Sequence, residues 1–301
     1  AAGTRALPDG NSLYAITCPY YSDDAGQTPN NQVLAVDEQT AVAVAVGSGS
    51  EIDGSNCAGS PAVDPIDGAV YALVAVDDDN FPILVTVDLV TGISTKVADI
   101  TDGEDPLLPQ AMAIGLDGAA YALYNADLYS LNLGDGVMTL IGETVGDAWG
   151  FVSDPITGLF YALDSDGQLF EIDVSDGSFV LLDQLSFLTT DEGTYSLTMD
   201  ANGVFWIGLD VESGDEYRVE LWSVTLADPA TSDEFVGELA LGSIAPYSEA
   251  LVIGPAYVAA APAPALAATG IDLVVPIVAG IVLLAVGVGL AVVARRQTRK
   301  N

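Results

Sequence analysis

The chain of 301 residues has no histidine, only 7 Lys and Arg, and 2 cysteines. Without histidine, a Ser-His-Asp or Cys-His catalytic site is excluded, as is any histidine-bound zinc or haem. Two cysteines without histidine make a weak metal site. An even pair predicts instead a disulfide between Cys18 and Cys57, the usual state of paired cysteines in exported proteins.

The chain has few basic and many acidic residues, and its formal net charge is −36. Up to Gly270 only Arg5, Lys96 and Arg218 are basic. Nucleic acid is therefore excluded as a partner, because phosphate contacts require Lys or Arg. Cations or a cation-rich cell wall fit this charge better, and a well-solvated surface explains the same acidity without any ligand.

One long apolar run interrupts this acidic chain near its end. Residues Leu273 to Ala294 are uncharged, and as a helix they would span about 33 Å, enough for a bilayer core of about 30 Å. Arg295 and Arg296 follow at once, so the positive-inside rule places the tail in the cytoplasm and the preceding chain outside. The start AAGTR has no Met, basic region or apolar region, as expected after removal of a signal peptide.

Between the two ends, a pair of short motifs recurs four times. A Gly-x-x-aromatic element places Tyr71, Tyr121, Tyr161 and Trp206 in register, in DPIDGAVYAL, GLDGAAYAL, DPITGLFYAL and DANGVFWIG. A second element follows each of them, in LVTVDLVTG, LYSLNLGDG, LFEIDVSDG and LWSVTLADP. Runs of β-branched and aromatic residues closed by Asp, Gly or Pro turns predict strands.

A unit of about 45 residues with four short strands is typical of a β-propeller blade. Four complete units begin near Ser60, Pro109, Trp149 and Tyr195. The N-terminal PDGNSLYAI lacks a first strand, and the C-terminal SEALVIGP resembles a first strand alone. Joined, they complete a fifth unit, which resembles the ring closure of the β-propeller superfamily. We therefore expect an all-β, five-bladed propeller closed by N- and C-terminal strands.

The repeats also predict two unlike faces of the disc. Tight turns between the first and second and between the third and fourth strands build one face, and longer irregular connections build the other. Variable loops on a rigid scaffold usually carry recognition, so we expect a ligand on the irregular face. Aromatic candidates for stacking on sugars or proline-rich peptides are Tyr20, Tyr21, Trp149 and Tyr195.

Calcium is the one metal cofactor that the oxygen-rich loops on the same face could hold. The candidate ligands are Asp77, Asp78, Asp79, Asp102, Glu104 and Asp105. They do not match the EF-hand spacing, and adjacent acids also form solvated loops. A pair of carboxylates could catalyse glycoside hydrolysis, which needs only an acid and a base or nucleophile at the right separation.

After Pro255 the sequence becomes AYVAAAPAPALAATG, a Pro/Ala-rich spacer. Its last five residues, followed by an apolar helix and a basic tail, resemble the LPxTG sorting signal of Gram-positive surface proteins in its LAxTG variant. The signal is Leu266, Ala267, Ala268, Thr269 and Gly270. The resemblance implies that a sortase cuts after Thr269 and joins it to cell wall peptidoglycan or a pilus subunit.

These observations divide the chain into a propeller ectodomain (1–255), a spacer with the sorting pentapeptide (256–270), a transmembrane helix (271–294) and a cytoplasmic basic tail (295–301). The working hypothesis is an exported, wall-anchored protein that binds an extracellular glycan or protein without catalysis. A carboxylate-dependent glycosidase or calcium-dependent hydrolase is one alternative. A structural coat protein is another.

Overall fold

The computed structural model describes residues 7–8, 10–17, 32–47, 55–76, 82–146, 148–188, 195–213, 216–229, 232–240 and 248–258. Within these ranges it describes the backbone but not the side chains of residues 55–58, 76, 195, 212–213, 216–217 and 248–249. No helix that could cross a bilayer occurs in these ranges. The predicted spacer beyond Val258, sorting pentapeptide, membrane segment and basic tail lie outside them.

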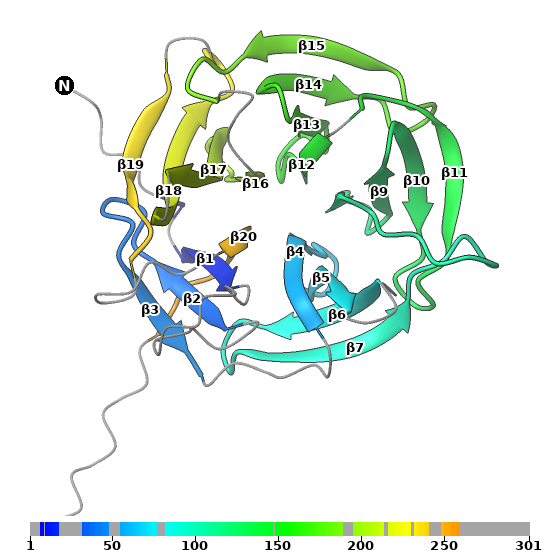
Figure 1. Ribbon diagram of the computed structural model, residues 1–301, viewed down its shortest axis with the longest axis horizontal. Helices are drawn as coiled ribbons and strands as arrows, with labels where there is room; N and C mark the ends of the chain where they lie inside the picture. Colours follow the sequence, from blue (N-terminus) through cyan, green and yellow to red (C-terminus); the bar gives the residue numbers. More distant parts are fainter. Residues whose placement is uncertain are drawn as a thin grey trace, which may run out of the picture. The chain divides into compact units, whose positions relative to one another are not determined.

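In the described ranges, twenty strands form five antiparallel sheets of four strands each, arranged as blades around a central axis (Figure 1). The strands of each blade are given from the centre outward. Blade 1 has β20 (Ser248–Pro255), β1 (Asn11–Thr17), β2 (Val33–Val36) and β3 (Ala43–Val46), and blade 2 has β4 (Ser55–Val63), β5 (Val70–Val76), β6 (Ile83–Asp88) and β7 (Ile93–Asp99). Blade 3 has β8 (Ala111–Ile114), β9 (Ala120–Tyr124), β10 (Asp127–Leu131) and β11 (Met138–Glu143), blade 4 has β12 (Ala148–Ser153), β13 (Phe160–Asp164), β14 (Gln168–Ile172) and β15 (Phe179–Gln184), and blade 5 has β16 (Tyr195–Met199), β17 (Val204–Ser213), β18 (Glu216–Thr225) and β19 (Glu234–Glu238).

The expected five-bladed propeller is confirmed, including its closure. The C-terminal strand β20 pairs antiparallel with β1 from Asn11↔Pro255 to Thr17↔Ser248 and supplies the innermost strand of blade 1. The Tyr14 hydroxyl also donates to the Pro255 carbonyl at 2.6 Å. Both ends of the propeller sequence are therefore held within one sheet.

The hydrophobic core is divided into five clusters, each lying between two neighbouring blades. Strand β5 shows why the strands are apolar on both sides. Val70, Ala72 and Val74 face the cluster shared with blade 1, whereas Tyr71 and Leu73 face the cluster shared with blade 3. Alternate side chains point to opposite faces of a strand, so a strand covered on both faces must be apolar throughout.

Aspartates at the tight turns fix the backbone, as the repeats suggested. Asp64 accepts a hydrogen bond from the Ile66 N–H at 2.8 Å, and Asp154 accepts from the Ile156 N–H at 2.7 Å. Asp88 does the same for the Val90 N–H at 2.8 Å. These are Asx-type contacts, in which the carboxylate takes the place of a backbone acceptor. Some of the acidic side chains of this protein thus stabilise its turns.

The last turn of a blade, between its third and fourth strands, also touches the blade before it. Gly92 has φ +72, and a Cβ built on it would lie 2.2 Å from the Val46 carbonyl oxygen of blade 1. Gly136 and Gly177 make the same approach to Asp99 and Glu143. These positions require glycine, because the backbone has a positive φ and because a Cβ would clash with the facing carbonyl oxygen.

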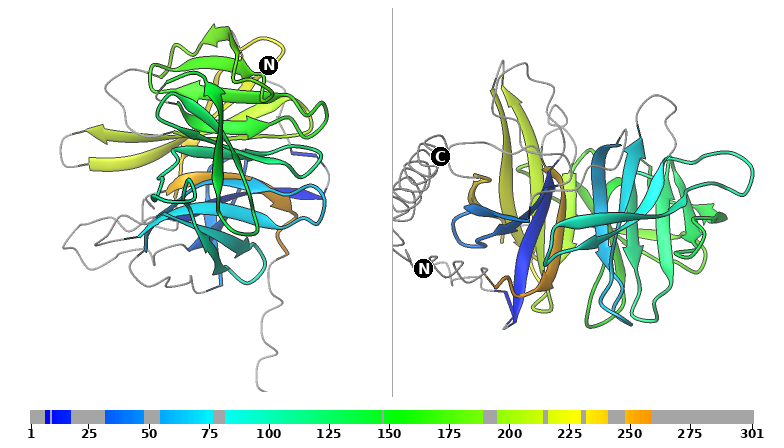
Figure 2. Two further views of the ribbon diagram at one scale, coloured as in Figure 1. Left: turned by 90° about the vertical axis from the view of Figure 1, so that its right-hand side faces the viewer. Right: turned by 90° about the horizontal axis from the view of Figure 1, so that it is seen from below.

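Blade 5 departs from the regular plan through a longer central hairpin. Strands β17 and β18 pair over ten residue pairs, from Val204↔Thr225 to Ser213↔Glu216. The hairpin extends past the neighbouring strands on one side of the disc (Figure 2). Its far end is one of the connections that the sequence assigned to the irregular face.

We predict that Gly92→Ala destabilises the propeller far more than Gly68→Ala. Both glycines have positive φ, but a Cβ at Gly68 has nothing within 4 Å. The left-handed conformation alone costs an alanine about 1 to 2 kcal/mol, which is the expected loss at Gly68. At Gly92 the clash with the Val46 carbonyl should bring the total above about 3 kcal/mol.

Urea unfolding followed by tryptophan fluorescence measures both losses. Equal losses for the two variants would contradict the role of Gly92 in packing blade 2 against blade 1.

We also predict that Asp88 contributes stability that is lost in acid. The Val90 N–H and the Thr91 contacts lower the pKa of Asp88 below its usual 3.8. A group whose pKa is lowered by folding stabilises the protein above its unfolded pKa and loses that contribution as pH falls through the lowered value. Asn132 occupies the equivalent turn of blade 3 and accepts from the Gly134 N–H at 2.9 Å, so Asp88→Asn should fold.

Thermal melts at pH 7 and at pH 2 to 3 test this expectation. The melting temperature of Asp88→Asn should lie below that of the wild type at pH 7, and the difference should shrink as pH falls below 3.8. A difference that is constant across this range would show that the charge of Asp88 plays no part.

Candidate functional site

A central cavity of about 410 Å³ lies between the five blades, beside the tight turns that join their first and second strands. All five blades contribute to it through the last residues of their innermost strands and the turns that follow. The lining residues include Ala62 and Val63, Ala113 and Ile114, Val152 and Ser153, Thr198 to Ala201, and Val252 to Pro255. A cavity of this volume falls in the range of small-molecule sites.

The wall of this cavity is mainly apolar. Phe151 and Met199 are buried beside it, and Pro65, Leu116 and Pro155 border it from three different turns. In the turns that border the cavity, several large apolar side chains face solvent. Their exposed fractions are 67% for Ile66, 42% for Leu116 and 66% for Ile156. An apolar cavity with apolar side chains near its mouth favours an uncharged, hydrophobic group as the ligand.

Among the described residues that line the cavity, Asp200 is the one charged side chain. It is 2% exposed. Its carboxylate accepts from the Asn202 N–H at 2.8 Å, the Val204 N–H at 3.1 Å and the Trp206 indole N–H at 3.3 Å. Asp200 therefore holds the turn and Trp206 in place. Glycoside hydrolysis needs two carboxyl groups, and this lining supplies one.

Two further cavities open on the tight-turn side, between neighbouring blades. One, lined by Tyr71 and Tyr121 among others, lies between blades 2 and 3. The other lies between the turns of blade 2 and Pro255. Burial raises the pKa of Tyr71 and Tyr121, and nearby carboxylates raise it further. These phenols therefore stay neutral and serve as packing groups.

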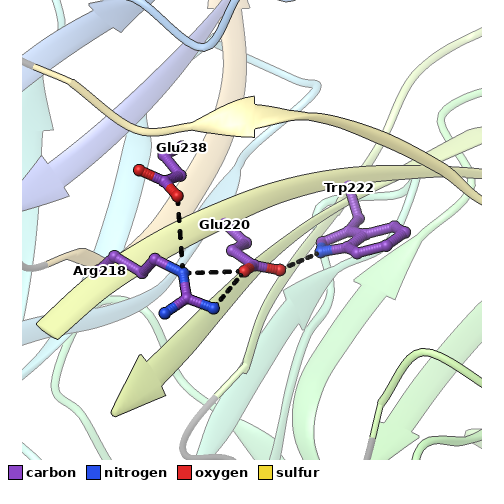
Figure 3. A network of polar contacts seen from close by, with 4 residues as sticks. All are labelled: Arg218, Glu220, Trp222 and Glu238. Carbon is purple, nitrogen blue, oxygen red and sulfur yellow. Dashed lines mark hydrogen bonds and ion pairs between the residues drawn. The ribbon is translucent and has the colours of Figure 1, made fainter. Parts of the chain in front are cut away.

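The two cations outside the N-terminal segment and the basic tail, Lys96 and Arg218, are both paired with carboxylates. The Lys96 ammonium lies 2.6 Å from Asp99. The Arg218 guanidinium donates twice to Glu220, at 2.8 and 2.9 Å, and lies 3.7 Å from Glu238 (Figure 3). Neither Lys96 nor Arg218 lines the central cavity, so nothing in its described lining attracts an anion.

The Arg218 cluster connects strand β18 to the outer strand β19 and to an aromatic stack. The Trp222 indole donates to Glu220 at 3.0 Å. Phe187 stacks on Trp222 with ring centroids 4.3 Å apart and planes 13° apart. These contacts hold the connection before blade 5 against its third strand.

The aromatic residues proposed for the irregular face are only partly described. Trp149 is 37% exposed near the start of β12, the innermost strand of blade 4. Tyr195 begins β16, the neighbouring innermost strand, but its side chain is not described. These two positions therefore lie at the same end of adjacent strands. Tyr20 and Tyr21 lie outside the described residues.

The predicted calcium ligands are not brought together as a metal site in the described part of the chain. There, no group of three or more His, Cys, Asp or Glu side chains could hold a metal ion. The Asp102 carboxylate accepts from the Glu104 and Asp105 N–H groups at 3.0 and 2.8 Å. These bonds lower its pKa and use it as a turn residue. Asp77, Asp78 and Asp79 lie outside the described residues.

The predicted disulfide likewise falls beyond what is described. Cys18 is outside the described residues, and Cys57 lies in strand β4 with its side chain undescribed. The central cavity, by contrast, was missed by sequence reasoning. The sequence contains one signal for this cavity: the four complete units align, so the ends of their first strands are expected to converge on the axis of the propeller.

No protein-family model and no curated protein matches this chain. Solved structures with a similar arrangement include TolB from Acinetobacter baumannii, at 17% identity and a TM-score of 0.42 over 80% of this chain and 56% of that one. A structural genomics protein of unknown function from Bacteroides thetaiotaomicron matches at 14% identity and 0.46, over 75% and 64%. Hydrazine synthase from Kuenenia stuttgartiensis matches at 12% and 0.40, over 62% and 50%.

The matched regions thus span between half and two thirds of these solved chains. Identities this low concern the fold alone. The function must be argued from the site.

Proposed function

We propose that this protein is a non-enzymatic binding module of the cell surface, and that its ligand occupies the central cavity beside the tight turns. The observation that carries the proposal is the composition of the cavity wall. Apolar residues from five blades surround about 410 Å³, and the one described carboxylate is already engaged by three donors. Such a wall can hold a ligand but offers no acid and base pair.

The chemistry of the wall selects an uncharged apolar ligand or an apolar side chain of a larger partner. Burying apolar surface contributes about 25 cal/mol per Å². An anion would meet the buried Asp200 and a chain of net charge −36. A polar uncharged ligand would find few partners, since the uncharged polar side chains of the lining are Asn11, Ser153 and Thr198, and Ser153 already donates to the Ile114 carbonyl at 2.6 Å. Recognition through Trp149 and Tyr195 at the opposite end of the innermost strands stays a separate prediction.

We predict that the full-length chain, reconstituted in nanodiscs, binds the neutral fluorescent probe N-phenyl-1-naphthylamine at one saturable site. Ala201 lines the cavity and is exposed, so Ala201→Trp should fill the space and weaken binding at least tenfold. Ala45 is exposed on the outer strand β3, and Ala45→Trp is the matched control. It should bind the probe as the wild type does.

Fluorescence titration measures the three affinities, with empty nanodiscs as the blank. If the wild type shows no saturable signal, or if both tryptophan variants behave alike, the cavity is not the binding site.

The location at the cell surface rests on the end of the sequence. We propose that LAATG is the sorting signal, that the following apolar segment holds the chain during export, and that Thr269 becomes the point of attachment to the wall. The support is the order of pentapeptide, apolar run and Arg-rich tail. Wall attachment would present the propeller to extracellular ligands.

We predict that Thr269→Ala shifts the protein from the wall fraction to the membrane fraction, because the sortase no longer recognises residue 269 as the acyl group that it transfers to the wall. Ala268→Ser, which changes the variable position of the pentapeptide, is the control and should leave the protein in the wall. Cell fractionation with immunoblotting measures both. Wild-type protein found intact in the membrane, with its C-terminal tail attached, would refute sorting.

A further inference from the structure

Strand β15 forms the outer edge of blade 4 (Figure 1). It exposes four consecutive large apolar side chains. Their exposed fractions are 48% for Phe179, 63% for Val180, 53% for Leu181 and 39% for Leu182. Alternate residues of a strand point to opposite faces, so Val180 faces one side of this edge and Phe179 and Leu181 face the other, where Phe179 also packs against the Phe170 ring. The cavities described above do not include any of these residues.

Strands β7 and β19 each carry two charged residues, of the kind that discourage edge pairing, whereas β15 carries one, Asp183, after its apolar run. The exposed Lys96 and Asp99 form an ion pair on β7. Strand β19 has Glu234 and Glu238 at its two ends. Strand β3 carries no charge, but the chain at its start is bridged to Ala240 of blade 5, and the Ala43 N–H donates to the Ala240 carbonyl at 2.7 Å.

Four outer strands have a bulge at the same place, and the bulge residue of blade 4 is more exposed than those of the other three. The pairing shifts by one residue at Val97 in β7, at Ile141 in β11, at Leu182 in β15 and at Val236 in β19. Val97, Ile141 and Val236 pack against the inter-blade clusters. Leu182 instead remains 39% exposed. The bulge residue of blade 4 is thus exposed, whereas its three counterparts are partly buried.

Carboxylates border this apolar edge. Asp176 precedes the strand and is exposed, and Asp183 follows Leu182. Glu171 on the neighbouring strand β14 pairs with Val180. A strand that pairs with this edge would place its apolar centre beside residues 179–182 and its two ends beside carboxylates. Basic residues at those ends would be complementary, since opposite charges across an interface favour association.

We propose that the outer edge of β15 accepts an extended peptide segment of a partner protein as a fifth strand of blade 4. The segment has an apolar centre of about four residues and basic residues at both ends. Strand addition of this kind gains affinity from main-chain hydrogen bonds and specificity from alternate side chains. A second copy of this chain fits less well, because antiparallel self-pairing would bring the carboxylates of two chains of net charge −36 together.

The test uses the full-length chain in nanodiscs and a labelled synthetic peptide with a Val-Thr-Val-Thr-Val centre and two lysines at each end. Val180→Lys adds a charge at an exposed position of the edge. Val44→Lys, on β3, is the matched control because Val44 is 51% exposed on another outer strand. We expect Val180→Lys to weaken peptide binding at least tenfold in fluorescence anisotropy and Val44→Lys to change it less than twofold.

Two altered peptides test the mode of binding. A peptide with glutamates in place of its lysines should bind at least tenfold more weakly, because it faces Asp176 and Asp183. A peptide with proline at its central position should also lose binding, because proline removes a backbone donor. Equal binding of the proline peptide would overturn strand addition, and equal binding of the glutamate peptide would overturn the basic partner.

Two further outcomes would overturn the proposal: absence of peptide binding to the wild type, and self-association in sedimentation velocity that Val180→Lys abolishes. The latter would identify a second copy as the occupant. Binding of N-phenyl-1-naphthylamine to Val180→Lys should match the wild type. That measurement keeps failure at the β15 edge distinct from failure of the proposed cavity function.

Discussion

The pairing of β1 with β20 is the interaction on which the rest of this propeller depends. It joins residues 241 positions apart, as in the hydrogen bond from the Tyr14 hydroxyl to Pro255. Each hydrophobic cluster lies between two blades, and blade 1 contributes to two of the five. Loss of its innermost strand would expose apolar surface on both sides. Closure therefore protects the core of blade 1 and, through it, the blades on either side.

The ring also explains how so acidic a chain can build a propeller. Many carboxylates lie in turns, where they accept backbone N–H groups, as Asp64, Asp154 and Asp200 do. The strands themselves are largely apolar because both faces of a blade are covered. Most of the described acidic side chains thereby stay out of the inter-blade cores, and the central cavity keeps a mainly apolar wall. The hydrophobic ligand that we propose would depend on this separation, because the protein has a net charge of −36.

Sequence reasoning located the blades well because each one repeats the same local pattern. Period-two apolar runs and Asp and Gly turns predicted units starting near Ser60, Pro109, Trp149 and Tyr195, and the innermost strands β4, β8, β12 and β16 begin at or near those positions. The fragments PDGNSLYAI and SEALVIGP lie in one sheet, as expected. By contrast, the loop residues chosen as ligands carried no such pattern. Asp102, for example, serves its own turn.

The sequence by itself determined the number of blades, the closing strands and the turns, because these follow from backbone preferences and from apolar periodicity within a few residues. Only the tertiary structure decided where surface is available. Whether the bulge residue of an outer strand is covered could not be read locally: Leu182 is exposed, whereas Val97 in the equivalent bulge is packed. Likewise, the cavity arises from side chains of five blades that are far apart in sequence. The burial of a side chain depends on the neighbouring blade, and the ring must close before that blade is in position.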